Sequence, residues 1–188
     1  IQFDVVSYTA RTEGWTAAHK AQEIGGLLNE LLSVGVMRGG WDYKTIGDAG
    51  VMVFNPSWAR GRGDHNPITS LQKATRVALL AAEEMHRVAF SRRYTLRIGI
   101  NVGSSTWYDI STFAGGHESS SVSPRLEANG DAFDLAARLE ATTEPQSTAV
   151  THCAMITAFG AHFTSKETQS NVMLGYLRAD NPGVLEPP

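Results

Sequence analysis

Apolar residues recur at helical spacing in several stretches of the chain. Residues 16–34 and 68–90 carry them at intervals of three and four, which is typical of a helix that buries one face. Residues 130–141 repeat the pattern and place Asp131 in the first turn, where a negative charge is favourable. A shorter apolar stretch at residues 151–159 predicts a last helix.

Other stretches are short and rich in β-branched and aromatic residues, which is typical of strands. They predict strands at residues 1–10, 43–46, 51–54, 94–102, 148–150 and 172–177. The segment Gly47-Asp48-Ala49-Gly50 separates the second from the third, so these two strands form a predicted β-hairpin. Residues 104–127 begin like a strand and become rich in Gly and Ser, which predicts a strand followed by a long loop.

The predicted elements follow the order β-α-β-β-α-β, with further elements after them. This order is the ferredoxin-like motif, so we expect an α/β (α+β) fold with that core and an appended C-terminal β/α part. At about 150 residues per domain, a chain of 188 residues makes one domain spanning residues 1–188. Because this fold serves many functions, the function must be argued from a site.

Composition narrows the class of partner. Hydrophobic residues make up 42% and charged residues 19%, and the net charge is −3. This balance argues against a broad surface for nucleic acid or for an anionic membrane, and the apolar runs are far shorter than the ~20 residues of a membrane span. The single cysteine, Cys153, fits a reducing compartment, and the chain shows no signal-peptide pattern. We therefore expect a cytoplasmic protein that binds neither nucleic acid nor membrane.

Two carboxylates stand out by their position. Asp4 lies within an apolar strand and Asp48 lies in the predicted hairpin turn. In the ferredoxin-like fold the first strand lies beside this hairpin, so the two side chains can meet. Paired carboxylates are a usual way to hold Mg²⁺ or Mn²⁺, which prefer oxygen ligands. The spacing alone also allows a simpler interpretation, in which Asp4 is a polar residue at a strand end and Asp48 a turn former.

Four segments resemble the motifs of the class III nucleotidyl cyclases, the adenylyl/guanylyl cyclase homology domain. Residues 3–9 (FDVVSYT) are similar to the first-strand motif F-x-D-I-x-G-F-T, and residues 44–50 (KTIGDAG) to the hairpin motif K-T-I-G-D-A-Y. Residues 97–103 (RIGINVG) resemble R-I-G-I-x-x-G, and residues 130–140 (GDAFDLAARLE) resemble G-D-x-V-N-L-A-A-R-L-E. The four occur in the family's order, whereas the resemblance is faint beyond about residue 150.

The resemblance implies two-metal catalysis. Asp4 and Asp48, together with the carbonyl of Val5, would hold two Mg²⁺ or Mn²⁺ ions in each active site. A nucleoside triphosphate would be converted to a 3′,5′-cyclic nucleotide and pyrophosphate.

Two arginines are implied to contact the substrate's phosphates. Arg138 would stabilise charge on the α-phosphate, for which a planar and permanently charged guanidinium is suited. Arg178 is the candidate, by position, for the basic residue that touches the triphosphate near the family's last strand. The alternative for Arg138 is an ion pair on the helix surface with Glu140 or Glu144.

The family's active site is divided between two chains. One protomer supplies the metal carboxylates, and the other supplies Arg138 and the residues that read the base. Lys44 and Asp48 are close in sequence and would nevertheless serve different sites. The resemblance therefore implies a head-to-tail homodimer with two-fold symmetry and shared active sites, and a monomer is not expected to cyclise its substrate.

Three departures from the family pattern bear on the substrate. Gly50 stands where the family has a bulky aromatic residue. Asp134 stands where the family has the Asn that positions the ribose. The segment before the last motif is longer than usual and places Glu127 at the base-reading position.

Lys44 matches the lysine that adenylyl cyclases use on adenine. Lys44 as a donor and Glu127 as an acceptor suit adenine or uracil, and guanine is also compatible with the pair. The remodelled segment and the single-domain architecture resemble the bacterial pyrimidine cyclases of anti-phage defence. This resemblance favours UTP as substrate and cUMP as product. The alternatives are an adenylate cyclase that makes cAMP from ATP, and an inert domain that binds nucleotide without turnover.

Overall fold

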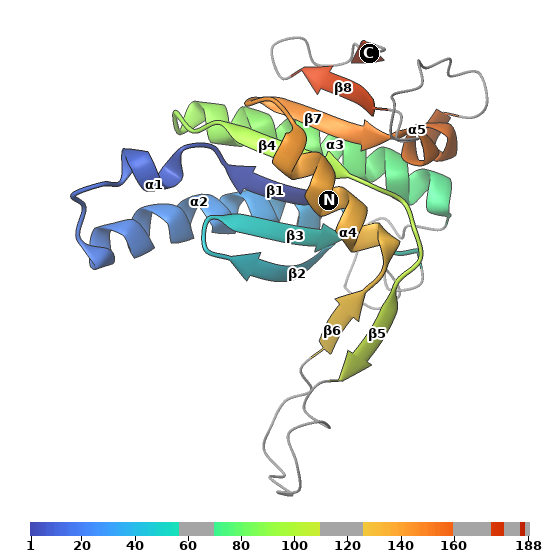
Figure 1. The fold of residues 1–188 in the computed structure, drawn as a ribbon, viewed down its shortest axis with the longest axis horizontal. Coiled ribbons are helices and arrows are strands. Elements are labelled where there is room, and N and C mark those ends of the chain that lie inside the picture. The colour runs from blue at the N-terminus through green and yellow to red at the C-terminus, as the bar shows by residue number, and fades with distance from the viewer. Residues whose placement is uncertain (57–69, 110–125, 160–173, 179–184, 187–188) are drawn as a thin grey trace, which may run out of the picture.

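The structure is a computed structural model, and it describes residues 1–56, 70–109, 126–159, 174–178 and 185–186 (Figure 1). Its elements are β1 (Gln2–Val5), α1 (Tyr8–Arg11), α2 (Ala17–Met37), β2 (Trp41–Ile46), β3 (Ala49–Val53), α3 (Leu71–Ser91), β4 (Leu96–Ile100), β5 (Thr106–Asp109), β6 (Leu126–Asn129), α4 (Asp131–Thr142), β7 (Ser147–Thr151), α5 (His152–Phe159), β8 (Leu174–Arg178) and β9 (Leu185–Glu186).

The main sheet has seven strands in the order β2-β3-β1-β4-β7-β8-β9. Its first four strands are antiparallel neighbours in the ferredoxin-like order, and β7 joins them parallel to β4. β8 and β9 extend the sheet as the appended C-terminal part. The expected fold class is therefore confirmed.

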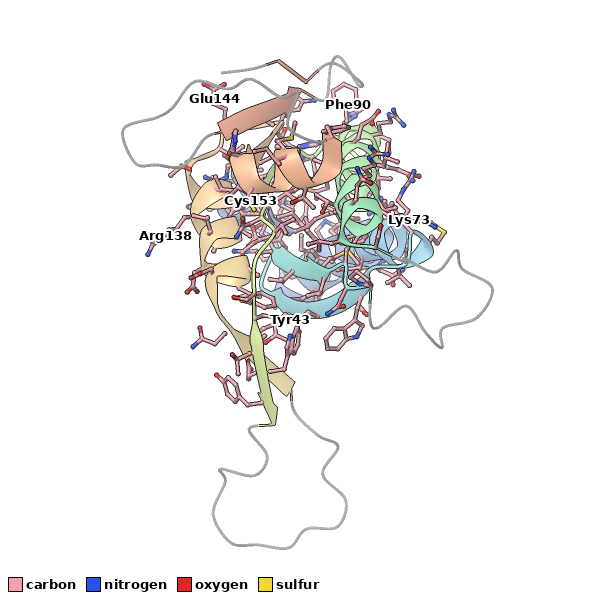
Figure 2. All side chains as sticks on the ribbon, turned by 90° about the vertical axis from the view of Figure 1, so that its right-hand side faces the viewer. Tyr43, Lys73, Phe90, Arg138, Glu144 and Cys153 are labelled. Atoms are coloured by element: carbon pink, nitrogen blue, oxygen red, sulfur yellow. The ribbon has the colours of Figure 1, made fainter. Side chains whose placement is uncertain are left out.

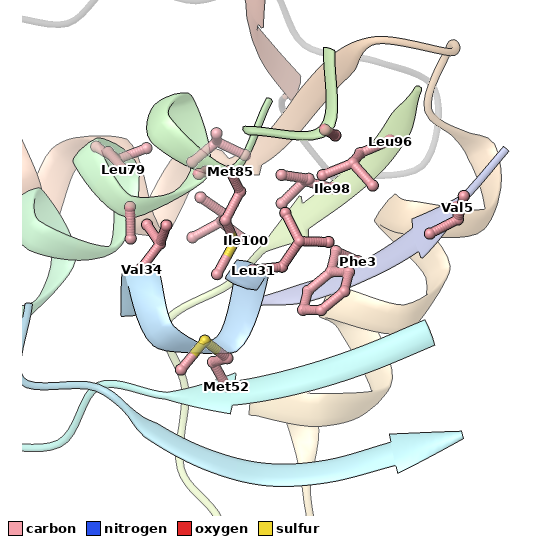
Figure 3. Packing of buried hydrophobic residues seen from close by; sticks show 14 of the residues in the cluster. Phe3, Val5, Leu31, Val34, Met52, Leu79, Met85, Leu96, Ile98 and Ile100 are labelled. Atoms are coloured by element: carbon pink, nitrogen blue, oxygen red, sulfur yellow. The ribbon is translucent and has the colours of Figure 1, made fainter. Parts of the chain in front are cut away.

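Helices cover both faces of this sheet, with α2 and α3 on one side and α4 on the other (Figure 1). The core lies between the sheet and the α2–α3 layer. Phe3, Leu31, Met85 and Ile98 are fully buried there, and they come from β1, α2, α3 and β4 (Figure 3). The predicted helical stripes are the surfaces that fill this layer. None of the helices in the described part of the chain is both long and apolar enough to cross a membrane.

Gly99 lets α4 lie directly on the opposite face. A Cβ atom at this position of β4 would lie 2.1 Å from the carbonyl oxygen of Ala136 and 2.6 Å from the amide nitrogen of Glu140. Only glycine permits this approach of two backbones. The position of α4, and of every side chain on it, therefore depends on Gly99.

Two of the predicted elements are wrong in part. The first strand ends at Val5 and not near residue 10, because Ser7 adopts a left-handed conformation with φ of 57° and α1 follows at once. The second error concerns the end of the predicted loop. We expected the loop to extend to residue 127, but β6 begins at Leu126 and pairs with β5 as a separate two-stranded sheet. Residues 110–125, which belong to the predicted loop, and residues 172–173 of the last predicted strand lie outside the described residues.

Candidate active site

The β1–β3 ladder brings the two candidate metal carboxylates together. Asp4 pairs with Ala49, and Asp48 directly precedes Ala49 in the tight turn between β2 and β3. Residues paired across antiparallel strands have Cα atoms about 5 Å apart. Asp4 and Asp48 are both half-buried, and Val5, the next residue of β1, is buried.

The electrostatics of this pair fit a bound cation. Burial raises the pKa of Asp48 above its ordinary value, and the negative charge of Asp4 raises it further, against a backbone hydrogen bond and the charge of Arg97. A divalent ion between the two carboxylates would relieve this repulsion. The described residues contain no cluster of three or more ligating side chains. Mg²⁺ commonly uses one or two carboxylates and takes its other ligands from water and substrate phosphates. Two carboxylates and the Val5 carbonyl are therefore sufficient as the ligands that the protein supplies.

Arg97 lies beside this carboxylate pair, and sequence analysis did not assign it a role. It is the register partner of Asp4 on β4. Its Nη2 donates to Asp4 Oδ2 at 2.7 Å, and its Nε lies 3.4 Å from Glu140 Oε1 on α4. Burial, followed by the charge of Asp4, raises the pKa of Glu140. The strand alternation around Asp4 and Arg97 was the signal that could have predicted this contact.

Lys44 and Glu127 meet although they are far apart in the sequence. Lys44 Nζ donates to both carboxylate oxygens of Glu127, at 3.2 Å to Oε1 and 3.1 Å to Oε2. Glu127 belongs to β6 and not to the predicted loop. Tyr43 also donates to Glu127 Oε2, at 3.0 Å, a contact that sequence analysis missed. A donor and an acceptor are thus side by side where the resemblance places base recognition.

Arg138 and Asp134 lie on a different face of α4 from Glu140, the residue of this helix that faces Arg97 and Asp4. Both are exposed on α4, and both line a shallow hollow together with Thr151. Arg138 points away from the body of the protein (Figure 2). It lies two residues before Glu140, or about 200° around the helix, and Glu140 faces Arg97 and Asp4.

The expected alternative, an ion pair of Arg138 with Glu140, is therefore wrong. Glu140 is buried and its ion pair is with Arg97. Among the residues that the structure describes, neither Glu144 nor any other carboxylate forms an ion pair with Arg138. Arg178 ends β8, where its backbone pairs with Ser147.

The departure at Gly50 is explained by packing. Gly50 is buried in β3 opposite Phe3 of β1. A Cβ atom on Gly50 would lie 2.4 Å from Cζ of the Phe3 ring. The Phe3 ring therefore fills the space that a side chain at position 50 would enter.

Structure comparison finds solved proteins with this architecture. The non-canonical dimeric guanylyl cyclase domain of the RhoGC fusion protein from the aquatic fungus Blastocladiella emersonii matches with a TM-score of 0.68 and 18% identity, over 93% of this chain and 91% of that chain. The guanylate cyclase domain of RhGC from Catenaria anguillulae in complex with GTP has a TM-score of 0.64 and 20% identity, over 93% and 91% of the two chains.

A bacterial structure is similar as well. The adenylyl cyclase CyaB from P. aeruginosa matches with a TM-score of 0.60 and 20% identity, over 83% of this chain and 76% of that chain. No family model matches the sequence, and comparison with curated proteins finds no match either. The chain therefore has the fold of the class III nucleotidyl cyclase catalytic domains. Guanylyl and adenylyl cyclases are its structural neighbours.

Proposed function

We propose that this protein is a nucleotidyl cyclase that works as a homodimer with two shared active sites. The observation that carries the proposal is the meeting of Asp4 and Asp48 beside the β2–β3 turn, within a fold whose structural neighbours are cyclases. The outward direction of Arg138 supports the shared site, because this arginine faces away from the carboxylates of its own chain.

The residues have distinct parts in the proposed reaction. Asp4, Asp48 and the carbonyl of Val5 would hold two Mg²⁺ or Mn²⁺ ions, and these ions would supply a lower pKa for the 3′-hydroxyl and neutralise phosphate charge. The 3′-hydroxyl would release its proton to water, its oxygen would form a bond to the α-phosphorus, and the bond from that phosphorus to the bridging oxygen would break as pyrophosphate leaves. The partner's Arg138 would stabilise the charge that develops on the α-phosphate. Arg178 is proposed to contact the triphosphate.

The base would be read by Lys44 and Glu127. Lys44 can donate to a base carbonyl or ring nitrogen, and Glu127 can accept from a base N–H. We favour UTP as substrate and cUMP as product, in cytoplasmic anti-phage signalling, because the segment before α4 and Asp134 depart from the pattern of purine cyclases. ATP is the second candidate, because Lys44 is the residue that adenylyl cyclases place on adenine.

The direct test is incubation with Mn²⁺ and each of ATP, GTP, UTP and CTP, followed by chromatographic identification of the product. We expect cUMP and pyrophosphate from UTP. Asp48→Asn should abolish product formation without unfolding the protein. Asp42→Asn, on the exposed side of the same hairpin, is the matched control and should remain active. A protein that binds nucleotide and yields no pyrophosphate from any of the four would be the inert domain instead.

A further inference from the structure

Tyr43 occupies an irregular position in the hairpin that carries Lys44. The β2–β3 register shifts between Asp42 and Lys44, so Tyr43 is the extra residue of a β-bulge on the edge strand. Consecutive residues of a regular strand point to opposite faces. Tyr43 and Lys44 nevertheless donate to the same oxygen, Oε2 of Glu127. A bulge re-aims a side chain, and here it turns two consecutive residues onto one carboxylate.

The hydroxyl of Tyr43 is oriented from both sides. Its oxygen accepts a hydrogen bond from the Ala128 amide at 2.8 Å and its hydrogen is directed to Glu127 Oε2 at 3.0 Å. Burial, the largest cause, raises the pKa of Tyr43, so the phenol keeps its proton as a donor. The Tyr43 hydroxyl thereby holds Glu127 Oε2 as the acceptor of its hydrogen bond.

An aromatic cluster fixes the ring itself. The Tyr43 ring lies 5.0 Å from the centre of Trp107 on β5, 5.4 Å from Phe133 on α4 and 5.7 Å from Trp41 on β2. These distances are typical of packed aromatic pairs. Two other elements, β5 and α4, therefore hold the Tyr43 ring together with Trp41 of its own strand, and Figure 2 shows Tyr43 near the base of the β5–β6 pair.

Lys44 is the movable partner in this arrangement. Its side chain is 41% exposed, whereas that of Glu127 is 22% exposed. When a base enters the site, Lys44 can leave Glu127 and donate to an acceptor atom of the base. Tyr43 remains on Oε2, because its ring and its hydroxyl are both fixed.

We propose that Tyr43 is a positioning residue that sets base preference by holding one oxygen of Glu127. This inference rests on the proposed function. It also names the class of base, which donates a single N–H to Glu127 and has, next to that N–H, an acceptor atom for Lys44. Uracil has this arrangement at N3–H and the adjacent carbonyl. Guanine presents two neighbouring N–H donors, which a carboxylate meets best with one donor on each oxygen, and the Tyr43 hydroxyl competes with guanine for Oε2.

The test measures nucleotide binding without turnover. 3′-Deoxy-UTP and 3′-deoxy-GTP lack the attacking hydroxyl, and their affinities in the presence of Mn²⁺ can be measured by titration calorimetry. The wild-type protein should prefer the uracil nucleotide. Tyr43→Phe keeps the ring, removes the hydroxyl, and should lower this preference by about tenfold, the size expected for a hydrogen bond to a charged group. Tyr94→Phe is the matched control, a buried tyrosine that precedes β4, and should keep the preference.

A second variant and a double-mutant cycle make the outcome decisive. Glu127→Asp shortens the side chain, moves the carboxylate away from the Tyr43 hydroxyl, and should lower the preference for the uracil nucleotide in the same way. This variant tests the inference if Tyr43→Phe does not fold. In the Glu127→Gln background, Tyr43→Phe should have no further effect on the ratio. A wild-type protein without preference, an unchanged ratio in both Tyr43→Phe and Glu127→Asp, or additive effects would overturn the inference. A uracil preference in a protein that forms no cyclic product would overturn the proposed catalysis and leave the role of Tyr43 standing.

Discussion

His86 is a buried histidine that should make the folded domain sensitive to mild acid. It lies on α3 with 2% of its surface exposed, and its Nε2 is 2.9 Å from the hydroxyl oxygen of Thr148 on β7. Burial lowers the pKa of His86 from its ordinary value of 6.5 to about 4, and the backbone of Ser147 offsets only part of this effect.

The sign of the effect follows from these two pKa values. The unfolded chain binds a proton on His86 near pH 6.5, whereas the folded chain binds it only near pH 4. Protonation therefore favours the unfolded chain. The free energy of unfolding that depends on neutral His86 is complete above pH 6.5 and falls as the pH drops toward 4. Between pH 8 and pH 5, linkage predicts a loss of about 2 kcal/mol.

Denaturant unfolding at pH 8 and at pH 5 measures this loss, with His86→Gln as the comparison. The glutamine amide can take the place of Nε2 beside Thr148, and it does not titrate. Asp48 and Glu140 have raised pKa values and act in the opposite direction, but they do so in both proteins and cancel in the difference. Wild-type protein should lose about 2 kcal/mol more than the variant. Parallel pH profiles for the two proteins would refute the reasoning.

Three further expectations concern packing and assembly. Gly99→Ala should lower the free energy of unfolding by about 3 kcal/mol in a denaturant titration, because the added methyl group meets the α4 backbone. Phe3→Ala and Gly50→Phe should each destabilise the protein, and their combination should recover part of the loss, since one ring replaces the other; additive losses would contradict the packing argument. Mixing Asp48→Ala chains with Arg138→Ala chains should restore up to about a quarter of wild-type activity, because half of the dimers would carry one intact site. Inactive mixtures of folded, paired chains would contradict the shared site.

The sequence pattern was sufficient for the elements that are long or locally determined. The two long helices were predicted at nearly their observed positions, since each carries a complete apolar stripe. The hairpin was predicted because Gly47-Asp48 is a strong local turn signal. β6 was missed, because this short strand depends on its pairing with β5 and follows a segment rich in Gly and Ser.

The candidate site could be predicted only in part. Asp4 and Asp48 followed from strand order, and Lys44 and Glu127 followed from the family resemblance. Their roles remain predictions. Tyr43 was missed because its contact depends on a bulge, and a one-residue change of register leaves no mark in the pattern of apolar positions.

Arg97 has a consequence for the resting protein. Its guanidinium already balances part of the charge of Asp4 and Glu140, so the sheet does not require a cation to assemble. Chelators should therefore leave the melting temperature almost unchanged and abolish turnover in the proposed reaction. In that reaction, the cation is therefore needed for turnover and not for folding.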